Sequence, residues 1–261
     1  MEASPSPRKL YLFGRVDLRG GDQEQTERLL VQPKLVALLA YLALAATPDA
    51  PGRFRRRDHL VGLLWPELDQ AHARAALRKA VHALRSVLGA EAVVSRGDEE
   101  LALADEAIWC DAVEFVADLE GGMLVRAIEL YRGELMPGFY LTGCGEFGRW
   151  LDDERATARE RAAGAAWALA VRSQEGSNYT DAGFWARRSI KFRWDDERAL
   201  RRALVMLATI GDRAGAMRLY DEFARRLRAE LEVEPSSETV SLVNALRTGE
   251  APPPLSARAG A

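Results

Sequence analysis

The stretch Arg74-Ala-Ala-Leu-Arg-Lys-Ala-Val-His-Ala-Leu-Arg85 decides how the first part of this chain folds. Apolar side chains recur in and just after it at steps of four, three and four residues, which places them on one side of a helix: Leu77, Val81, Leu84 and Leu88. The side chains that fall mostly on the other side are Arg74, Arg78, Lys79, His82 and Arg85. A helix with an apolar back and a cationic front suits the major groove of DNA. An ordinary amphipathic surface helix has the same pattern, so the neighbouring segments have to separate the two interpretations.

The segments on either side of this helix predict a winged helix. The expected elements are strands at residues 10–16 and 29–31, helices at 34–46, 58–65 and 69–88, and a hairpin that pairs 92–95 with 101–103. Pro33 suits the first turn of one helix, Asp58 is a suitable N-cap for the next, and Gly89 ends the long one. The order strands, helix, helix, long helix, hairpin is the layout of a winged helix-turn-helix, with the long helix in the recognition position.

From about Cys110 onward the pattern changes to helices almost without strands. The expected helices span residues 111–119, 123–131, 147–173, 181–192, 195–210, 212–231 and 237–246. Two of them look alike, because Ala182 and Ala216 lie 34 positions apart, as do Ala186 and Tyr220. This is the period of tetratricopeptide-type helical hairpins, in which small residues let paired helices approach closely.

These patterns predict a mainly α protein with two domains. An N-terminal winged helix-turn-helix domain of α+β type is followed by an all-α, tetratricopeptide-like helical repeat domain. The expected boundaries are 1–9 for a disordered N-terminus, 10–107 for the winged helix, 108–247 for the helical repeat domain and 248–261 for a disordered tail or linker.

Positive charge is concentrated in the predicted winged helix. The whole chain carries a formal net charge of −3, which excludes a uniformly basic protein that coats nucleic acid. Between Arg53 and Arg96, however, nine arginines and lysines face four acidic residues, a net charge of about +5. A solvated helix face would also be cationic, but together with the element order this charge favours contact with DNA phosphates.

The cationic residues differ in the contact that we expect of them. Arg78, Lys79 and His82 are the candidates for base edges, since arginine can form a bidentate pair with guanine. Arg74 and Arg85 are candidates for phosphate contacts. A second group lies outside the long helix: Arg55, Arg56, Arg57 and Arg96. The first three precede the second helix, where they could clamp the DNA backbone or form a solvated loop.

The sequence offers no site for catalysis. It contains no P-loop, GxSxG or HExxH pattern, and the cluster at residues 152–154 lies in a highly charged helix, which favours exposed salt bridges. Cys110 and Cys144 form no CxxC pair, and the three histidines show no paired metal-ligand spacing. We therefore expect no enzyme activity, no cofactor and no metal. The longest apolar run, 35–46, is too short to span a bilayer, so we expect no membrane association and a cytoplasmic location at the nucleoid.

Taken together, these segments resemble the Streptomyces antibiotic regulatory protein (SARP) family, over residues 10–247. In the first domain the resemblance rests on PKLVALLAYLA at 33–43, LLWP at 63–66 and AALRKAVHALRSVLG at 75–89. In the second domain it rests on LYRGELMPGF at 130–139, EFGRWLDDER at 146–155, GDRAGA at 211–216 and ELEVEPSSET at 230–239. Each motif alone is loose, but their joint presence in this order is specific.

The resemblance implies an OmpR-like winged helix joined to a bacterial transcriptional activation domain. It implies an activator that binds repeated promoter elements in double-stranded DNA and recruits RNA polymerase, with a homodimer possible on repeated sites. Two features depart from this pattern: the hairpin tip, Asp98-Glu-Glu100, is acidic, with Arg96 as its one cation, and the receiver domain of OmpR-type response regulators is absent. The alternative is a non-enzymatic helical-repeat scaffold whose winged helix mediates protein–protein contacts.

Overall fold

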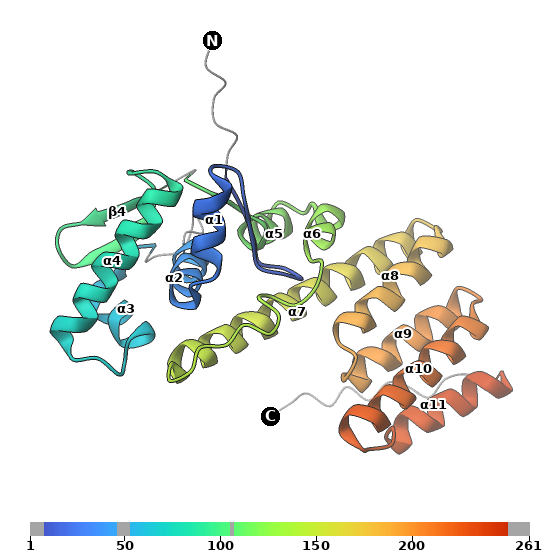
Figure 1. Ribbon diagram of the computed structural model, residues 1–261. Coiled ribbons are helices and arrows are strands. Elements are labelled where there is room, and N and C mark those ends of the chain that lie inside the picture. Colours follow the sequence, from blue (N-terminus) through green and yellow to red (C-terminus); the bar gives the residue numbers. More distant parts are fainter. Residues whose placement is uncertain (1–7, 46–52, 105–106, 250–261) are drawn as a thin grey trace, which may run out of the picture. The chain divides into compact units, whose positions relative to one another are not determined.

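A computed structural model describes residues 8–45, 53–104 and 107–249 of the chain (Figure 1). Packing divides the chain into two compact units, unit 1 at 1–158 and unit 2 at 159–261. The boundary falls inside one long helix, α7 (Gly145–Glu175). The predicted fold class is confirmed: a mainly helical chain with a small N-terminal sheet region, a winged helix and a helical domain.

Unit 1 begins with a three-stranded sheet in the order β2-β1-β6. Its strands are β1 (Lys9–Tyr11), β2 (Asp17–Arg19) and β6 (Trp109–Cys110). Leu10 faces Leu18 in the antiparallel pair and Cys110 in the parallel pair. The prediction of disorder up to residue 9 was therefore wrong at Lys9, because β6 returns to pair with β1; residues 1–7 lie outside the described residues. The expected strand at 10–16 is also shorter than predicted.

The predicted strand at 29–31 was wrong, because this segment ends a helix, α1 (Gln23–Leu30). Asp22 caps the helix by accepting a hydrogen bond from the backbone N–H of Gln25 at 2.8 Å. Thr26 and Leu29, three positions apart, are buried on one face, while the rest of the helix is mostly exposed. The helix has only eight residues, and the apolar run of Leu29, Leu30 and Val31 at its end resembles a short strand.

Three further helices form the core of the winged helix: α2 (Pro33–Leu44), α3 (Arg57–Leu64) and α4 (Gln70–Leu88). Each of them contacts the other two. Every residue of α2 from Leu35 to Ala43 is buried, which explains its uniformly apolar sequence. The prediction that Asp58 is the N-cap of α3 was wrong. The N-cap is Arg56, and Asp58 lies in the first helical turn. Its carboxylate is instead paired with Arg74 of α4.

The predicted hairpin is present as β4 (Val93–Arg96) and β5 (Glu100–Leu103), and it forms the wing. Its tight turn contains Gly97 at a φ of 59°, a conformation that favours glycine. A third strand, β3 (Arg55–Arg56), pairs with β5 and gives the sheet order β3-β5-β4. The sequence did not predict β3, because two arginines before a helix show no apolar alternation.

The rest of unit 1 contains helices and a loop, and its first helix, α5 (Asp111–Glu120), packs on the first sheet and on α2. The helices that follow are α6 (Leu124–Leu130) and the first part of α7. The aromatic ring of Phe13 lies 5.3 Å from that of Phe115 and 4.9 Å from that of Tyr131. The ring of Trp150 in α7 lies 4.6 Å from Tyr41 in α2. The winged helix thus shares its packing with the first helices of the predicted second domain.

Arg155 of α7 explains one of the sequence motifs in unit 1. Its guanidinium donates hydrogen bonds to the carbonyl oxygens of Leu135 at 2.9 Å, Met136 at 2.5 Å and Phe139 at 3.3 Å. Met136 has a φ of 45°, so the loop that these bonds hold adopts a strained backbone. Arg155, which belongs to the motif at 146–155, therefore holds the loop that the motif at 130–139 forms.

Unit 2 contains α8 (Tyr179–Phe192), α9 (Glu197–Thr209), α10 (Arg213–Leu231) and α11 (Ser237–Thr248), which follow one another as antiparallel neighbours (Figure 1). The seven helices expected after Cys110 are all present, each within two residues of the predicted ends. Ala182, Ala186 and Ala216 are fully buried where the helices meet. The N-caps Asn178 and Asp212 share the 34-residue offset. The repeat seen in the sequence is therefore structural.

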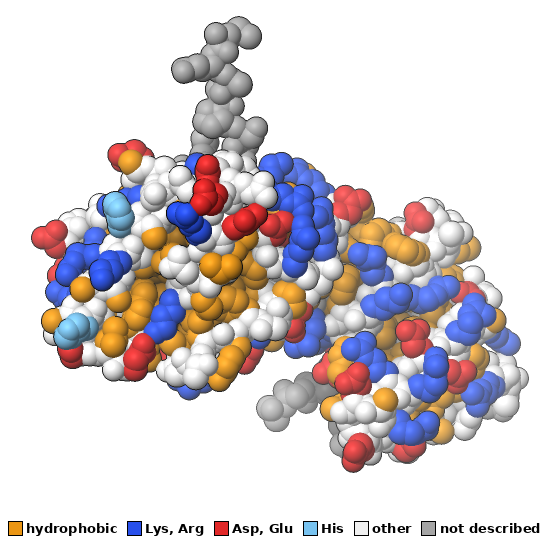
Figure 2. All heavy atoms as spheres, viewed as in Figure 1, with side chains coloured by type: hydrophobic (Ala, Val, Ile, Leu, Met, Phe, Trp, Pro, Cys, Tyr) orange, Lys and Arg blue, Asp and Glu red, His pale blue; other side chains and the backbone are white. Residues whose placement is uncertain are grey.

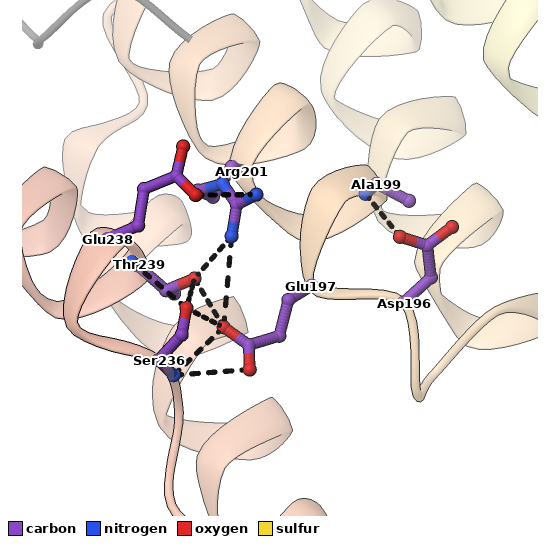
Figure 3. A network of polar contacts seen from close by, with 7 residues as sticks. All are labelled: Asp196, Glu197, Ala199, Arg201, Ser236, Glu238 and Thr239. Atoms are coloured by element: carbon purple, nitrogen blue, oxygen red, sulfur yellow. Dashed lines mark hydrogen bonds and ion pairs between the residues drawn. The ribbon is translucent and has the colours of Figure 1, made fainter. Parts of the chain in front are cut away.

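A polar clamp joins the start of α9 to the start of α11 (Figure 3). The carboxylate of Glu197 accepts hydrogen bonds from the Ser236 hydroxyl at 2.6 Å and the Thr239 hydroxyl at 2.5 Å. The Ser236 backbone N–H also donates to it, at 3.0 Å. Arg201 donates to the Thr239 hydroxyl at 3.0 Å and lies 3.1 Å from the Glu238 carboxylate. This clamp explains the motif at 230–239.

The division by packing differs from the domain boundary expected at 107/108. That boundary follows a change of sequence pattern, whereas packing keeps residues 108–158 with the winged helix. The boundary at 107/108 stays a prediction. The predicted tail at 248–261 was wrong at Thr248, which belongs to α11; residues 250–261 lie outside the described residues.

Candidate nucleic-acid interface

The helix α4 presents the cationic face that its sequence predicted. Asp69 caps its start by accepting the backbone N–H groups of Ala71 and His72, both at 3.0 Å, and Gly89 ends it. The apolar face is buried against α2, α3 and the wing: Ala73, Leu77, Ala80, Val81, Leu84, Val87 and Leu88. Because these contacts fix the rotation of the helix, Arg78, Lys79 and His82 face solvent.

Five of the nine candidate residues line one hollow between α4, the start of α3 and the wing turn. They are Arg57, Arg74, Arg78, His82 and Arg85. The hollow has a volume of about 430 Å³, and Leu77 and Val81 form its apolar floor. Figure 2 shows Lys, Arg and His side chains gathered over α4. Lys79 lies on the same helix, outside the hollow.

Arg74 and Arg85 are engaged by the protein itself. The Arg74 guanidinium lies 2.7 Å from the Asp58 carboxylate, an ion pair that is partly exposed on both sides. Arg85 donates two hydrogen bonds to the carbonyl oxygen of Val93, at 2.9 and 2.6 Å, and so holds β4 against α4. Both residues were expected to contact phosphates. In Arg85, however, two nitrogens of the guanidinium already donate to the wing.

Arg57 is a partly buried cation of the hollow. Burial lowers its pKa, the nearby Arg85 lowers it further, and Asp98 acts in the opposite direction. Its guanidinium donates to the Ser95 hydroxyl at 3.2 Å, and its buried Nε has no hydrogen-bond partner among the described residues. A cation whose charged form is disfavoured by neighbouring cations gains from a bound anion, such as a phosphate oxygen.

Arg55 and Arg56 do not reach the hollow, because both belong to β3. The Arg55 guanidinium lies over the ring of Tyr41, 5.7 Å from its centre. Arg56 is exposed and lies 3.9 Å from the Glu99 carboxylate. Of these two arginines, which were expected to clamp the DNA backbone, Arg56 is the one that remains exposed.

Arg96 of the wing is folded onto the sheet. Its Nε lies 2.5 Å from the Glu100 carboxylate, and its guanidinium lies 4.5 Å from the centre of the Phe54 ring. Asp98 and Glu99 are exposed at the turn. The described part of the wing tip is therefore acidic, and phosphates would be repelled there.

Three residues outside the predicted DNA-binding set help to shape the hollow: Asp58, Ser95 and Asp98. Asp58 and Ser95 come from α3 and β4, and their partners on α4 and α3 are 16 and 38 positions away in sequence. No local pattern could reveal these contacts. The acidity of Asp98 was visible, but its position beside Arg57 and Arg78 was not.

The described residues give little support to a metal site, a reactive thiol at Cys110 or a membrane-spanning helix. No group of three His, Cys, Asp or Glu side chains within them could hold a metal ion. Burial raises the pKa of the Cys110 thiol to about 12, so this cysteine is not a nucleophile at neutral pH. Over the ranges that the structure describes, no helix is long and apolar enough to cross a membrane.

Two comparisons relate this chain to known proteins. A family model described as the bacterial transcriptional activator domain matches residues 121–247. Among solved structures, Mycobacterium tuberculosis EmbR, in complex with a low affinity phosphopeptide, is similar in fold, with a TM-score of 0.54 and 17% identity. The match covers 94% of this chain and 66% of EmbR, so the chain spans just under two thirds of that relative. No curated protein matches the sequence.

The two comparisons cover different parts of the fold. The likeness to EmbR concerns the fold alone and includes the winged helix. The matched family model covers the end of unit 1 and most of unit 2.

Proposed function

We propose that this chain is a SARP-like transcriptional regulator that binds double-stranded promoter DNA through α4; the match to the bacterial transcriptional activator domain over residues 121–247 supports this proposal. In this proposal α4 enters the major groove, where Arg78, Lys79 and His82 contact base edges. Arg57 and Arg56 contact the phosphates beside it. Arg74 can add a phosphate contact by exchanging its partly exposed pairing with Asp58, and Arg85 supports the wing.

The observation that carries this proposal is the state of three side chains on α4. Arg78, Lys79 and His82 are exposed, and no hydrogen bond or ion pair joins them to another described residue. The helix beneath them is held by seven buried side chains, so the backbone positions from which they project are fixed before any DNA binds. A rigid helix with exposed polar side chains over an apolar back is what recognition in the major groove requires.

We further propose that the protein acts as an activator by recruiting RNA polymerase through its activator domain. Support for this step comes from the match over residues 121–247 and from the resemblance in sequence. Binding as a homodimer to repeated sites, and a location in the cytoplasm at the nucleoid, belong to the same proposal. The acidic wing tip makes a wing contact with DNA unfavourable, so α4 supplies most of the recognition.

Selection of bound sequences from random duplex DNA, followed by gel-shift titration, tests DNA binding. We expect a preferred sequence to emerge, and we expect the double variant Arg78→Ala/Lys79→Ala to bind that sequence at least about thirtyfold more weakly, since each base-edge pair contributes roughly 1–3 kcal/mol. The matched control is Arg172→Ala/Arg198→Ala, which removes two exposed cations of unit 2. Unchanged specific affinity in the Arg78→Ala/Lys79→Ala variant would sink the proposal.

A further inference from the structure

Unit 2 contains a long groove between α8 and α10 to which neither the fold nor the family assigns a role. One part has a volume of about 550 Å³ and runs from Thr180 past Phe184 to Glu222. A smaller part of about 40 Å³ continues it toward Trp194 and Phe223. The two parts share Lys191, Leu219 and Glu222, so they form one continuous surface.

The floor of this groove is apolar. Leu219 and Phe223 are buried, and Phe184 exposes 52% of its surface at the groove. The ring of Phe184 packs edge-on against that of Trp185, with ring centres 4.9 Å apart, and this contact holds its position. An aromatic side chain fixed at a groove and half open to water is a suitable anchor for an apolar side chain of a partner.

The walls of the groove are cationic. The basic side chains that line it are Arg187, Arg188, Lys191, Arg218 and Arg226, and its acidic lining residue is Glu222. Arg187 is held by Asp212 at 2.5 Å, whereas Arg218 lies 4.0 Å from the same carboxylate and is 73% exposed. Lys191 is exposed and forms no hydrogen bond or ion pair with another described residue. The positive charge of the groove is therefore only partly neutralised.

We propose that this groove docks an acidic amphipathic peptide segment of a partner protein. Its apolar side chains lie on Phe184 and Leu219, and its carboxylates pair with Lys191 and Arg218. An apolar floor between cationic walls matches such a segment in both respects, and a helix laid in a groove between two helices is a common recognition mode. Duplex nucleic acid fits less well, because its bases are stacked inside the double helix and its phosphates gain nothing from the exposed ring of Phe184.

The test uses a fluorescein-labelled peptide of roughly 16 residues, about four helical turns, with Leu and Phe along one face and Asp and Glu elsewhere. Fluorescence anisotropy measures its binding to the full-length protein. We expect saturable binding that weakens as salt rises. The charge-reversal variant Lys191→Glu/Arg218→Glu should bind about tenfold more weakly or worse, and Phe184→Ala should lose affinity with its charge unchanged.

The controls separate this groove from the winged helix. Arg172→Glu/Arg198→Glu reverses two exposed cations of unit 2 outside the groove and should bind the peptide like the wild type. Arg78→Ala/Lys79→Ala should do the same, so loss of DNA binding leaves peptide binding intact. Thermal unfolding of each variant confirms that it is folded.

Three results would overturn the proposal: no binding at about 100 µM peptide, which corresponds to less than roughly 5.5 kcal/mol; equal affinity for an analogue with Asn and Gln in place of the acids; or unchanged binding by the groove variants. Displacement of the peptide by duplex DNA from the Arg78→Ala/Lys79→Ala protein would also overturn it, because the groove would then be a nucleic-acid site.

Discussion

The cations of α4 differ in what holds them. Arg85 is bound to the wing through the Val93 carbonyl, and Arg74 is paired with Asp58, whereas Arg78 and Lys79 are free at the surface. The same residue type on the same helix therefore serves structure at one position and recognition at another. Variants at these positions should separate stability from DNA binding.

Replacing Arg85 with alanine should destabilise the wing. Both hydrogen bonds to Val93 O are lost, and the partly buried carbonyl is left without its donor, which costs about 1–3 kcal/mol of unfolding free energy. Arg78→Ala, at an exposed position, should change stability by less than about 0.5 kcal/mol. Urea titration followed by circular dichroism measures both. Equal stability of the two variants would show that Arg85 does not anchor the wing.

The sequence predicted which face of α4 each of these residues occupies, because helical spacing determines it. It did not predict their partners. Val93 lies beyond the turn at Gly89, and Asp58 lies on a different helix, so both contacts depend on how elements pack. Roles that depend only on spacing could be predicted at the residue scale, and roles that depend on tertiary contacts could not.

Elements with a strong local signal were predicted well, and those fixed by tertiary pairing were not. The long helix, the wing and the seven later helices each show a clear period or turn. By contrast, β3 and β6 have two residues each and exist only because they pair with β5 and β1. Such short strands form through their partners, so no local pattern marks them.

The junction between β1 and α5 should make the stability of unit 1 depend on pH. Asp111 accepts the backbone N–H groups of Leu12 at 2.8 Å and Phe13 at 3.2 Å, yet burial raises the pKa of its carboxyl group to about 6. A raised pKa means that the folded state favours the protonated acid. The contribution of Asp111 to stability is therefore complete below the unfolded pKa and is lost as pH rises toward 6.

Comparison with Asp111→Asn isolates this effect, because asparagine does not ionise. Between about pH 4 and pH 7 the wild type should lose about 2 kcal/mol of unfolding free energy relative to the variant. Urea titrations at a series of pH values measure the difference between the two proteins. Parallel pH profiles would contradict the assignment.

The clamp at Glu197 should hold α11 to α9. Although burial raises the pKa of Glu197, hydrogen bonds from Ser236 and Thr239 lower it below its ordinary value. Glu197→Ala leaves the fully buried Thr239 hydroxyl without its acceptor, so we expect a loss of about 2–3 kcal/mol. The exposed partner provides the control: Glu238→Ala should cost less than about 1 kcal/mol. Similar losses in both variants, measured by thermal unfolding, would refute the clamp.

At the scale of the whole molecule, charge and packing are distributed unevenly. The net charge of −3 conceals a cationic α4 and a cationic groove in unit 2. The pattern of the sequence changes near residue 107, but packing keeps residues up to 158 with the winged helix. Sequence periodicity shows which faces are apolar and not which faces meet, so the packing boundary could not be predicted from it.

The salt dependence of DNA binding by the whole protein tests the central claim most directly. With Arg56, Arg57 and Arg74 as the phosphate contacts, we expect the logarithm of the affinity for a selected duplex to fall against the logarithm of salt concentration with a slope of about −2 to −3. The Arg78→Ala/Lys79→Ala variant should keep this slope but bind the selected duplex at least about thirtyfold more weakly, because its two missing side chains contact base edges and not phosphates. A slope near zero, or no binding to duplex DNA at about 50 mM salt, would contradict the account and favour a protein-binding scaffold.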